Sequence, residues 1–420
     1  MKKKFKSEVG ITLIALIITV VIIILLAGIS ISEISGEGLI SRTLSAREQA
    51  EIQGEKETIQ AAVVNAKGRN RYGKLTKDEL EDELNSNGNT AEVTEYMSNL
   101  LVHLTESNRY YETTKSGQVT KMEIEEANVD VAERFNNGDY TWQDIHEMAK
   151  IISGMYGSGI DRTSGEVEFI YDKKIVKLEV GDEFDLVGKI TLNNNEKDYT
   201  YRVRIIGFNS DILSSDQYKD GKYEAGFTRA GITFEFTNFF RWDGMNENGQ
   251  MNSTRTNVDG WGASAMRDSL NDPTTLIRLT NSTYIKTVDK LYLATYNSSV
   301  QSISQDKLWL LASSEVFIYS GPSTPKYGWA RDAESEVDES YNGQYKWYKD
   351  NVTVNNGDGE AKKFNSNYND TTYGNGNPGF WWLRSHHHQQ PAYFLLVSNS
   401  GGISNGWEDS NYYISPGFCI

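Results

Sequence analysis

Side chains suited to molecular recognition are concentrated in residues 380–420 of this 420-residue chain. The segment mixes Tyr and Trp, which supply rigid contact area, with Ser, Gly and Asn, which supply adaptable hydrogen bonds, and such a composition is typical of binding surfaces. Interface hot spots favour Trp and Tyr, so Trp407, Tyr412 and Tyr413 are the expected anchors. An ordinary polar loop surface is the alternative interpretation. The candidate ligand-binding residues are His386, His387, His388, Gln389, Gln390, Tyr393, Asn399, Asn405, Trp407, Glu408, Asp409, Asn411, Tyr412 and Tyr413.

Two hydrophobic motifs, at 381–385 and 416–418, flank the candidate binding residues 386–413 and are expected to form their scaffold. A buried tryptophan pair would fix the base of a site and let the rim vary without loss of fold. The three consecutive histidines could bind a metal, but adjacent residues of an extended chain point to opposite faces, so no metal site is expected. The scaffold residues are Trp381, Trp382, Arg384, Pro416 and Phe418.

The sequence offers little for catalysis. A single cysteine, Cys419, excludes intrachain disulfides, Cys-pair redox chemistry and clustered-Cys metal sites. The sequence contains no Ser-His-Asp spacing and no His-Glu-x-x-His motif. The glycine-rich tract 373–379 lacks the lysine and the following helix of a phosphate loop. We therefore expect neither an enzyme nor a bound cofactor.

The N-terminal segment indicates on which side of a membrane a binding surface would lie. Residues 9–32 carry no charge, and at ~1.5 Å per residue a helix of this length crosses the ~30 Å hydrocarbon layer of a membrane. Lysines at positions 2, 3, 4 and 6 precede this run. By the positive-inside tendency they predict a cytoplasmic N-terminus and an extracellular C-terminal domain, in a single-pass membrane protein.

A lone glycine, Gly10, stands between the basic leader and the apolar run, in the order Glu8-Val9-Gly10-Ile11-Thr12-Leu13. This segment resembles the prepilin signal of type IV pilins and pseudopilins. The resemblance implies that a prepilin peptidase cuts between Gly10 and Ile11 and leaves the apolar helix on the mature protein. Ala15 stands where that family typically carries a glutamate that pairs with a neighbouring subunit, so assembly with other pilin subunits is left open. A plain single-pass anchor with an uncleaved leader is the alternative.

Changes in residue pattern divide the remainder of the chain. Apolar residues recur at three to four residue spacing up to Ala66, which predicts an amphipathic extension of the anchor helix. Glycines between 154 and 165 indicate a linker. The predicted divisions are a leader at 1–10, a transmembrane and amphipathic helix at 11–68, a small α/β region with its linker at 69–165, and one domain at 166–420. In the small region we expect helices over 77–86 and 140–153 and strands over 99–105 and 119–124.

From residue 166 onward, short aromatic strands alternate with loops rich in Asn, Asp and Gly, which predicts an α+β domain with a curled antiparallel sheet. Several sequence motifs resemble those of an uncharacterised clostridial domain family related to the C-type-lectin and formylglycine-generating-enzyme folds. Two of them are Tyr201-Arg202-Val203-Arg204-Ile205 and Phe380-Trp381-Trp382-Leu383-Arg384-Ser385. The resemblance spans nearly all of 170–420 and implies a lectin-like fold. The residue types gathered in 380–420 also resemble the variable region of proteins diversified by retroelements.

Calcium is the one cofactor for which weak signals exist. Residues 350–360 are rich in oxygen ligands, but their spacing does not follow the EF-hand pattern. Trp407-Glu408-Asp409 is faintly similar to the Trp-Asn-Asp calcium strand of C-type lectins. A solvated acidic loop is the preferred interpretation of both segments.

The formal net charge of -16 repels phosphate backbones, so we expect no nucleic-acid partner. Taken together, the patterns favour a pilin-like cell-surface protein that displays a C-type-lectin-like domain for adhesion or recognition. Its ligand would be an unknown surface protein or glycan. The alternative is a structural minor pilin or pseudopilin that caps a fibre or a secretion machine and has no ligand of its own.

Overall fold

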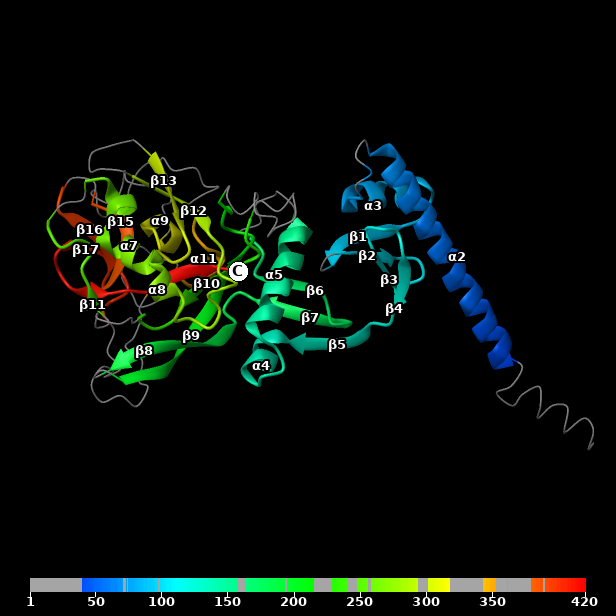
Figure 1. Cartoon of the computed structure of the whole chain (residues 1–420), viewed down its shortest axis with the longest axis horizontal. Coiled ribbons are helices and arrows are strands. Elements are labelled where there is room, and N and C mark those ends of the chain that lie inside the picture. The colour runs from blue at the N-terminus through cyan, green and yellow to red at the C-terminus, as the bar shows by residue number, and fades with distance from the viewer. Residues whose placement is uncertain are drawn as a thin grey trace, which may run out of the picture. The chain divides into compact units, whose positions relative to one another are not determined.

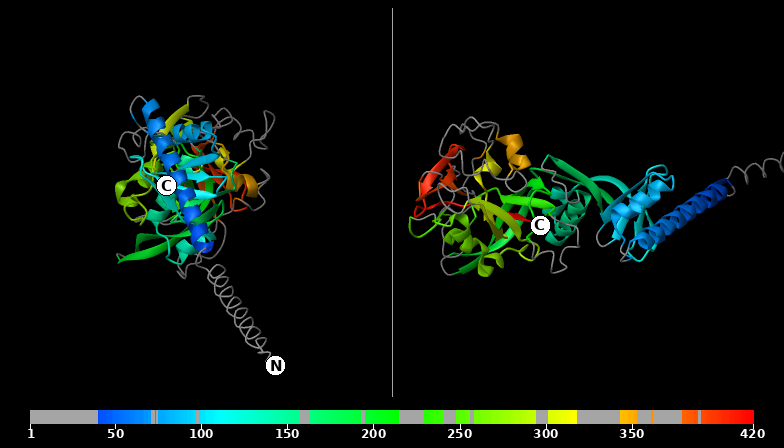
Figure 2. Two further views of the ribbon diagram at one scale, coloured as in Figure 1. Left: turned by 90° about the vertical axis from the view of Figure 1, so that its right-hand side faces the viewer. Right: turned by 90° about the horizontal axis from the view of Figure 1, so that it is seen from above.

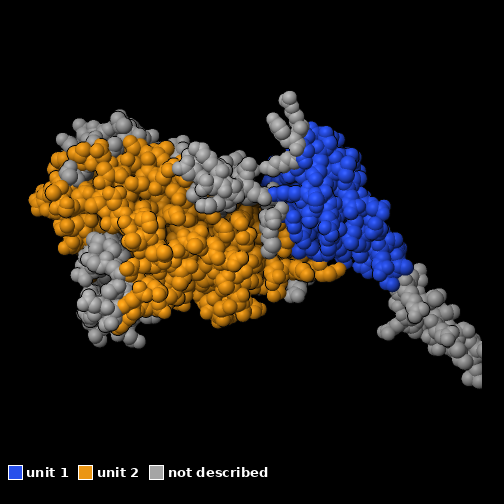
Figure 3. Space-filling view, in the orientation of Figure 1, with its two compact units in different colours: residues 1–93, 98–122 blue, residues 94–97, 123–420 orange. Residues whose placement is uncertain are grey.

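The computed structural model describes residues 40–70, 73, 75–96, 99–156, 163–192, 195–214, 229–240, 248–255, 258–293, 301–317, 343–352, 361, 379–387 and 390–420. The expected leader, the Gly10–Ile11 cleavage site and the uncharged run 9–32 lie outside these residues. The chain divides into two compact units, which we call unit 1 (residues 1–93 and 98–122) and unit 2 (residues 94–97 and 123–420) (Figure 3).

Unit 1 packs a long helix and a short helix with a small sheet (Figure 1). The helices are α2 (Ile40–Arg69) and α3 (Lys77–Ser86). The strands are β1 (Ala91–Tyr96), β2 (Asn99–Leu104), β3 (Arg109–Thr113) and β4 (Val119–Met122), in the order β1-β2-β3-β4. Helix α2 runs without a break (Figure 2). Over the described part of the chain, no helix is both long and apolar enough to cross a membrane.

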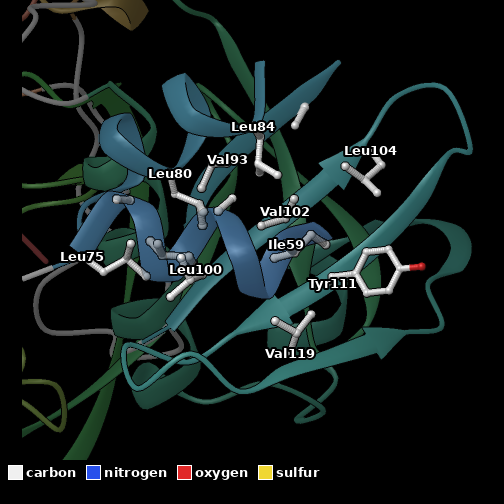
Figure 4. Packing of buried hydrophobic residues seen from close by; sticks show 14 residues of the cluster. Ile59, Leu75, Leu80, Leu84, Val93, Leu100, Val102, Leu104, Tyr111 and Val119 are labelled. Carbon is white, nitrogen blue, oxygen red and sulfur yellow. The ribbon is translucent and has the colours of Figure 1, made fainter. Parts of the chain in front are cut away.

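The C-terminal half of α2 carries the apolar stripe that the spacing predicted. Ile59, Ala62, Val63 and Ala66 are all buried, and their spacing of three and four residues places them on one face of the helix. They join a hydrophobic core whose other members include Leu80, Leu84, Leu100, Val102 and Tyr111 (Figure 4). Unit 1 is thus a helix-on-sheet structure with its own core.

Helix α3 begins where the sequence predicted, at a capping box. The Thr76 hydroxyl accepts a hydrogen bond from the Glu79 backbone N–H at 3.3 Å, and the Glu79 carboxylate accepts one from the Thr76 backbone N–H at 3.3 Å. This reciprocal pair satisfies two donors that the first helical turn leaves open. The expected helix over 77–86 is confirmed.

Unit 2 is an α+β structure with two five-stranded sheets. The central sheet has the order β14-β19-β10-β9-β8 and consists of β14 (Trp309–Leu310), β19 (Pro416–Cys419), β10 (Ile232–Phe236), β9 (Asn195–Phe208) and β8 (Glu183–Leu192). The C-terminal sheet has the order β11-β18-β15-β16-β17 and consists of β11 (Asn248–Gly249), β18 (Tyr412–Tyr413), β15 (Trp381–His386), β16 (Tyr393–Val397) and β17 (Ile403–Trp407). Strands β15 to β17 appear in the orange and red of the chain's last residues (Figure 1).

Smaller elements complete unit 2. A three-stranded sheet has the order β5-β7-β6, with β5 (Glu125–Asp130), β7 (Lys174–Glu179) and β6 (Glu166–Tyr171), and β12 (Val288–Leu293) pairs with β13 (Gln301–Asp306). The helices are α4 (Val131–Asn136), α5 (Trp142–Tyr156), η1 (Gly260–Ala263), α7 (Ala265–Asn271), α8 (Pro273–Leu276), α9 (Ser313–Val316) and α11 (Lys346–Asn351).

The division between the units falls at residues 122 and 123, not at the glycine-rich linker near 165. Helix α5 explains the difference. Its Trp142 ring lies 5.6 Å from Phe234 in an edge-to-face arrangement, and the Ser153 hydroxyl donates a hydrogen bond to the Arg229 carbonyl at 2.6 Å. Gly231 lies so close to α5 that an added Cβ atom would come within 1.9 Å of the Ala149 carbonyl oxygen. Helix α5 therefore shares a core with the central sheet, through contacts too distant in sequence for local patterns to reveal.

Candidate functional site

The expected tryptophan base lies in strand β15, all six residues of which are buried. Trp381 and Trp382 are both completely buried. The Trp382 indole N–H donates a hydrogen bond to the Gly249 carbonyl at 2.7 Å, which joins β15 to the β11 segment. The Trp381 indole N–H donates to the Ala361 carbonyl at 3.2 Å. Both polar atoms are satisfied, so the pair forms a rigid base for the C-terminal sheet.

Arg384, Pro416 and Phe418, the other expected scaffold residues, are also buried. Arg384 binds the Glu315 carboxylate through two nitrogens, at 2.6 and 3.0 Å. Phe418 lies on the central sheet and stacks on Phe234 at a centroid distance of 5.2 Å. These residues connect the two five-stranded sheets to the core of unit 2 and do not reach the surface.

An aromatic pair with one exposed ring lies at the edge of the C-terminal sheet. Tyr393 of β16 and Trp407 of β17 are directly opposite each other in the strand register, and their ring centroids lie 4.2 Å apart. Trp407 is 37% exposed and is the one aromatic among the large exposed hydrophobic residues of the described chain. Tyr393 is half-buried. Cross-strand aromatic pairs of this kind stabilise a sheet and keep each ring in a fixed position.

A positively charged group lies against this pair. The Arg255 guanidinium lies 4.0 Å from the centre of the Trp407 ring, within range of a cation–π interaction. The Arg255 Nε atom also lies 3.0 Å from the Asp409 carboxylate, and the Arg255 side chain is 53% exposed. Arg255, Tyr393, Trp407 and Asp409 thus form one surface patch, which we call the Trp407 surface. It combines flat aromatic area with a fixed cation and its counter-ion.

Sequence patterns did not predict Arg255, because it lies 154 residues before Asp409 in the chain and belongs to no recognised motif. The strand register that brings the two segments together is β11 with β18, in which Gly249 lies opposite Tyr412. No local sequence signal indicates that pairing.

The other two expected anchors pack inside unit 2. Tyr412 is half-buried and meets Trp382 edge to face, with ring centroids 4.9 Å apart. Tyr413 is half-buried and stacks on Phe239 at 4.1 Å with an interplanar angle of 9°. Their rings support the tryptophan base, so Trp407 alone of the three expected anchors is exposed.

Three more of the expected ligand-binding residues are buried. His386, His387 and Glu408 are 3%, 6% and 0% exposed, which differs from the expectation that they face a ligand. For His386 the reason is that all six residues of β15 are buried, so alternation along the strand gives no exposed side at its end. Gln390, Asn399 and Asn411 are exposed, and Asn405 and Asp409 are half-buried. His388 and Gln389 lie outside the described residues.

No three His, Cys, Asp or Glu side chains converge as metal ligands within the described ranges. Of the acidic segment 350–360, Asp350 is paired with Lys346, and residues 353–360 are not described. In the Trp407-Glu408-Asp409 segment, Glu408 is buried and Asp409 is paired with the Arg255 cation, so these two carboxylates do not face a common calcium site.

A separate pocket of about 450 Å³ lies in unit 1 and is lined by Glu51, Glu55, Arg109 and neighbouring residues of the sheet. Arg109 forms ion pairs with both glutamates, at 3.4 and 3.1 Å. Hydrogen bonds from Arg47 and, to a smaller extent, from Arg109 lower the pKa of Glu51. Arg109 therefore offsets only part of the negative charge of Glu51, Glu55 and Glu106, which also line the pocket.

Residues 232–420 match a protein family described as a domain of unknown function, DUF6273. The matched region runs from β10 to the end of the chain and contains the Trp407 surface and its tryptophan base. No curated protein and no solved structure matches this chain.

Proposed function

We propose that the chain is a pilin-like cell-surface protein whose unit 2 binds a ligand through the Trp407 surface. The ligand would be a glycan or a protein on another surface, and no bond would be made or broken. The observation that carries this proposal is the exposed Trp407 ring, paired with the half-buried Tyr393 across two strands of a sheet whose tryptophan base is completely buried. Rigid aromatic groups lose little entropy on binding, so they suit a recognition surface.

The display part of the proposal rests on the N-terminal sequence. The basic leader, the lone Gly10 and the uncharged run 9–32 resemble a prepilin signal and anchor. Unit 1 supports this interpretation, because the apolar stripe of α2 packs on a small sheet, and pilins use their helix as such a spine. Mass spectrometry of the exported protein tests the processing step. A mature N-terminus at Ile11 is expected, and an intact Met1 would contradict it.

The alternative, a structural subunit that caps a fibre, would be expected to cover Trp407 with a neighbouring subunit. A receptor needs Trp407 uncovered. Adhesion of the protein to a printed glycan array and to whole bacterial cells tests the choice. We expect Trp407→Ala and Arg255→Ala each to abolish adhesion and to lower the free energy of unfolding by no more than ~2 kcal/mol, the sum of a cross-strand aromatic pair and an exposed cation–π contact.

A matched control is Ile277→Ala, which removes another exposed hydrophobic side chain, 76% exposed, outside the Trp407 surface. It should leave adhesion unchanged. Unaltered adhesion by Trp407→Ala, or a large fall in its melting temperature, would reject the assignment of this surface. A chain that adheres to neither the array nor the cells would argue for the structural alternative.

We further propose that retroelement diversification acts on residues 380–420. Sequencing the 3′ end of the gene from many cells of one strain tests it. Differences should fall at exposed positions such as Asn399, Asn411 and Trp407 and should spare the completely buried Trp381 and Trp382. An identical sequence in all cells would contradict this part of the proposal and leave the binding surface itself unaffected.

A further inference from the structure

Four charged side chains meet in the core of unit 2. Asp211, Lys290, Glu315 and Arg384 are between 0% and 2% exposed. They come from the segment after β9, from β12, from α9 and from β15, so the cluster joins parts of the chain that are far apart in sequence. Two carboxylates and two cations balance in charge. Burying charged groups costs several kcal/mol per ion, and a cluster of this kind calls for a specific explanation.

Lys290 and Asp211 are in direct contact within this cluster. The Lys290 Nζ atom lies against Asp211 Oδ1, at ion-pair distance. The nitrogen also lies 3.2 Å from Glu315 Oε1. A primary amine is therefore held against one carboxyl group, with a second carboxylate beside it to accept protons.

Hydroxyl groups bind the two oxygens of Asp211. The Tyr345 hydroxyl donates to Oδ1 at 2.8 Å, and the Thr233 hydroxyl donates to Oδ2 at 2.5 Å. The Cys419 thiol donates to Oδ2 at 3.3 Å. Donors placed on a carboxyl group stabilise the negative charge that develops on oxygen when a nucleophile attacks its carbon. The hydrogen bonds thus hold the Asp211 carboxyl plane fixed with respect to the Lys290 amine.

Buried groups surround the reacting pair. The Lys290 nitrogen lies 4.0 Å from the centre of the Trp309 ring, which is completely buried. Burial penalises both an ammonium and a carboxylate. At Asp211 the Lys290 cation and the hydrogen bonds outweigh burial and hold the pKa below its ordinary value, so the ion pair is the form from which the reaction starts. Burial would raise the pKa of Glu315, but the neighbouring Arg384 and Lys290 cations hold that pKa below its ordinary value. Glu315 is thus an ionised base, oriented by Arg384.

From this geometry we propose that Lys290 and Asp211 join through an intramolecular isopeptide bond, with Glu315 as the proton carrier. One ammonium proton passes from Lys290 to Asp211, which leaves a neutral amine and a carboxylic acid. The Lys290 nitrogen then attacks Asp211 Cγ, and a C–N bond forms. Glu315 accepts a second proton from the nitrogen and delivers it to the departing hydroxyl group. The C–O bond breaks, and one water molecule leaves.

The reaction balances without any other reactant: one ammonium and one carboxylate give one amide and one water, and Glu315 ends as it began. Formation of the amide also replaces the buried Lys290–Asp211 ion pair by an uncharged group. Glu315 and Arg384 remain as an ion pair without net charge, joined by two hydrogen bonds at 2.6 and 3.0 Å. The cluster therefore stays balanced in charge after condensation.

A cross-link of this kind would tie the segment after β9 to β12 within unit 2. The chain contains one cysteine and so has no intrachain disulfide. An amide between side chains would give unit 2 a covalent tie that does not depend on redox conditions. This inference concerns the core of unit 2 and does not depend on the proposed ligand-binding function.

Peptide mass spectrometry of the full-length purified protein, denatured and digested with trypsin, tests the bond. Trypsin cleaves after unmodified lysine and arginine, so a modified Lys290 leaves the peptide 287–307 uncut. We expect this peptide joined to 205–219, lighter than the sum of the two by one water, with fragment ions that place the bond at Asp211 and Lys290. Separate peptides, with cleavage after Lys290, would overturn the proposal.

Variants identify the roles of the residues. Lys290→Arg and Asp211→Ala should abolish the loss of water, and Glu315→Gln should leave most of the chain without the bond. The matched control is Glu235→Gln, because Glu235 is also completely buried but pairs with Arg204, whose guanidinium is no nucleophile here. It should keep the cross-linked peptide. Loss of water that persists in Lys290→Arg would refute the assignment, and the result on the unaltered protein decides the question even where a variant does not fold.

Discussion

Removal of residues 123–164 is expected to abolish cooperative unfolding of unit 2. These residues include helix α5, whose large apolar side chains are buried. The four that matter most are Trp142, Ile145, Met148 and Ile152. Full burial of such side chains contributes ~1.5–3 kcal/mol each, so their loss removes roughly 6–12 kcal/mol. A whole domain is stable by only ~5–15 kcal/mol. The fragment 165–420 should therefore lack a cooperative transition, whereas 123–420 should have one.

Thermal melts of both fragments, followed by near-ultraviolet circular dichroism, test this expectation. A point variant gives a graded version of the same test. Trp142 packs against Phe184, Phe234 and Phe418, so Trp142→Ala in 123–420 should cost ~3–5 kcal/mol. At ~2–4 °C per kcal/mol, that lowers the melting temperature by about 6–20 °C. Gln143→Ala, at the exposed neighbouring position, is the control and should change stability by less than ~0.5 kcal/mol.

A fragment 165–420 that melts cooperatively at the same temperature as 123–420 would refute this reasoning. The linker near 165 would then be the true domain boundary, as the glycine pattern predicted, and α5 would be a dispensable addition. Equal melting temperatures for Trp142→Ala and Gln143→Ala would lead to the same conclusion.

Three further perturbations probe other parts of the structure, each measured by thermal or denaturant unfolding. Gly231→Ala would place a Cβ atom 1.9 Å from the Ala149 carbonyl oxygen and should destabilise unit 2 by at least ~1–3 kcal/mol, whereas a neutral result would contradict the packing of α5 on β10. Thr76→Ala should cost unit 1 ~0.5–2 kcal/mol, and Thr76→Ser should restore most of it, because a serine hydroxyl can cap α3 in the same way. Burial and two neighbouring lysines lower the pKa of His146 to about 3, from 6.5 in the unfolded chain. The unfolded state then binds the proton first, so stability should fall as pH drops below 6.5, by no more than about 2 kcal/mol at pH 5, and His146→Gln should flatten that slope.

The elements that the sequence predicted are those with strong local signals. Helix α3 follows the Thr76 cap, and the predicted strand over 99–105 coincides with β2. The apolar spacing from Ile59 to Ala66 correctly predicted the buried stripe of α2. In each case the signal is carried by residues a few positions apart along the chain, so periodicity and capping residues are sufficient to show the element.

The parts that could not be predicted depend on contacts between distant segments. Composition identified Trp407 and the tryptophan base, but not Arg255, which reaches the site through the pairing of β11 with β18. The motif residue Arg384 was expected beneath a binding site, and the structure gives it a partner, Glu315, 69 residues away. Sequence patterns show in which segments particular residue types are concentrated. The strand order of the two sheets decides which of them face one another.

In the C-terminal sheet, substitutions are costly to stability in the buried base and cost little at the exposed edge. Every residue of β15 is buried, four of the five in β16 are buried, and in β17 only Gly406 is. Replacing a buried tryptophan of β15 by alanine would cost ~3–5 kcal/mol, a large part of the ~5–15 kcal/mol by which a typical domain is stable. Substitutions at the exposed edge usually cost under ~0.5 kcal/mol. A surface built this way can change its contacts at Trp407 and its neighbours while the fold beneath it stays the same, which is the physical requirement for a recognition site that varies.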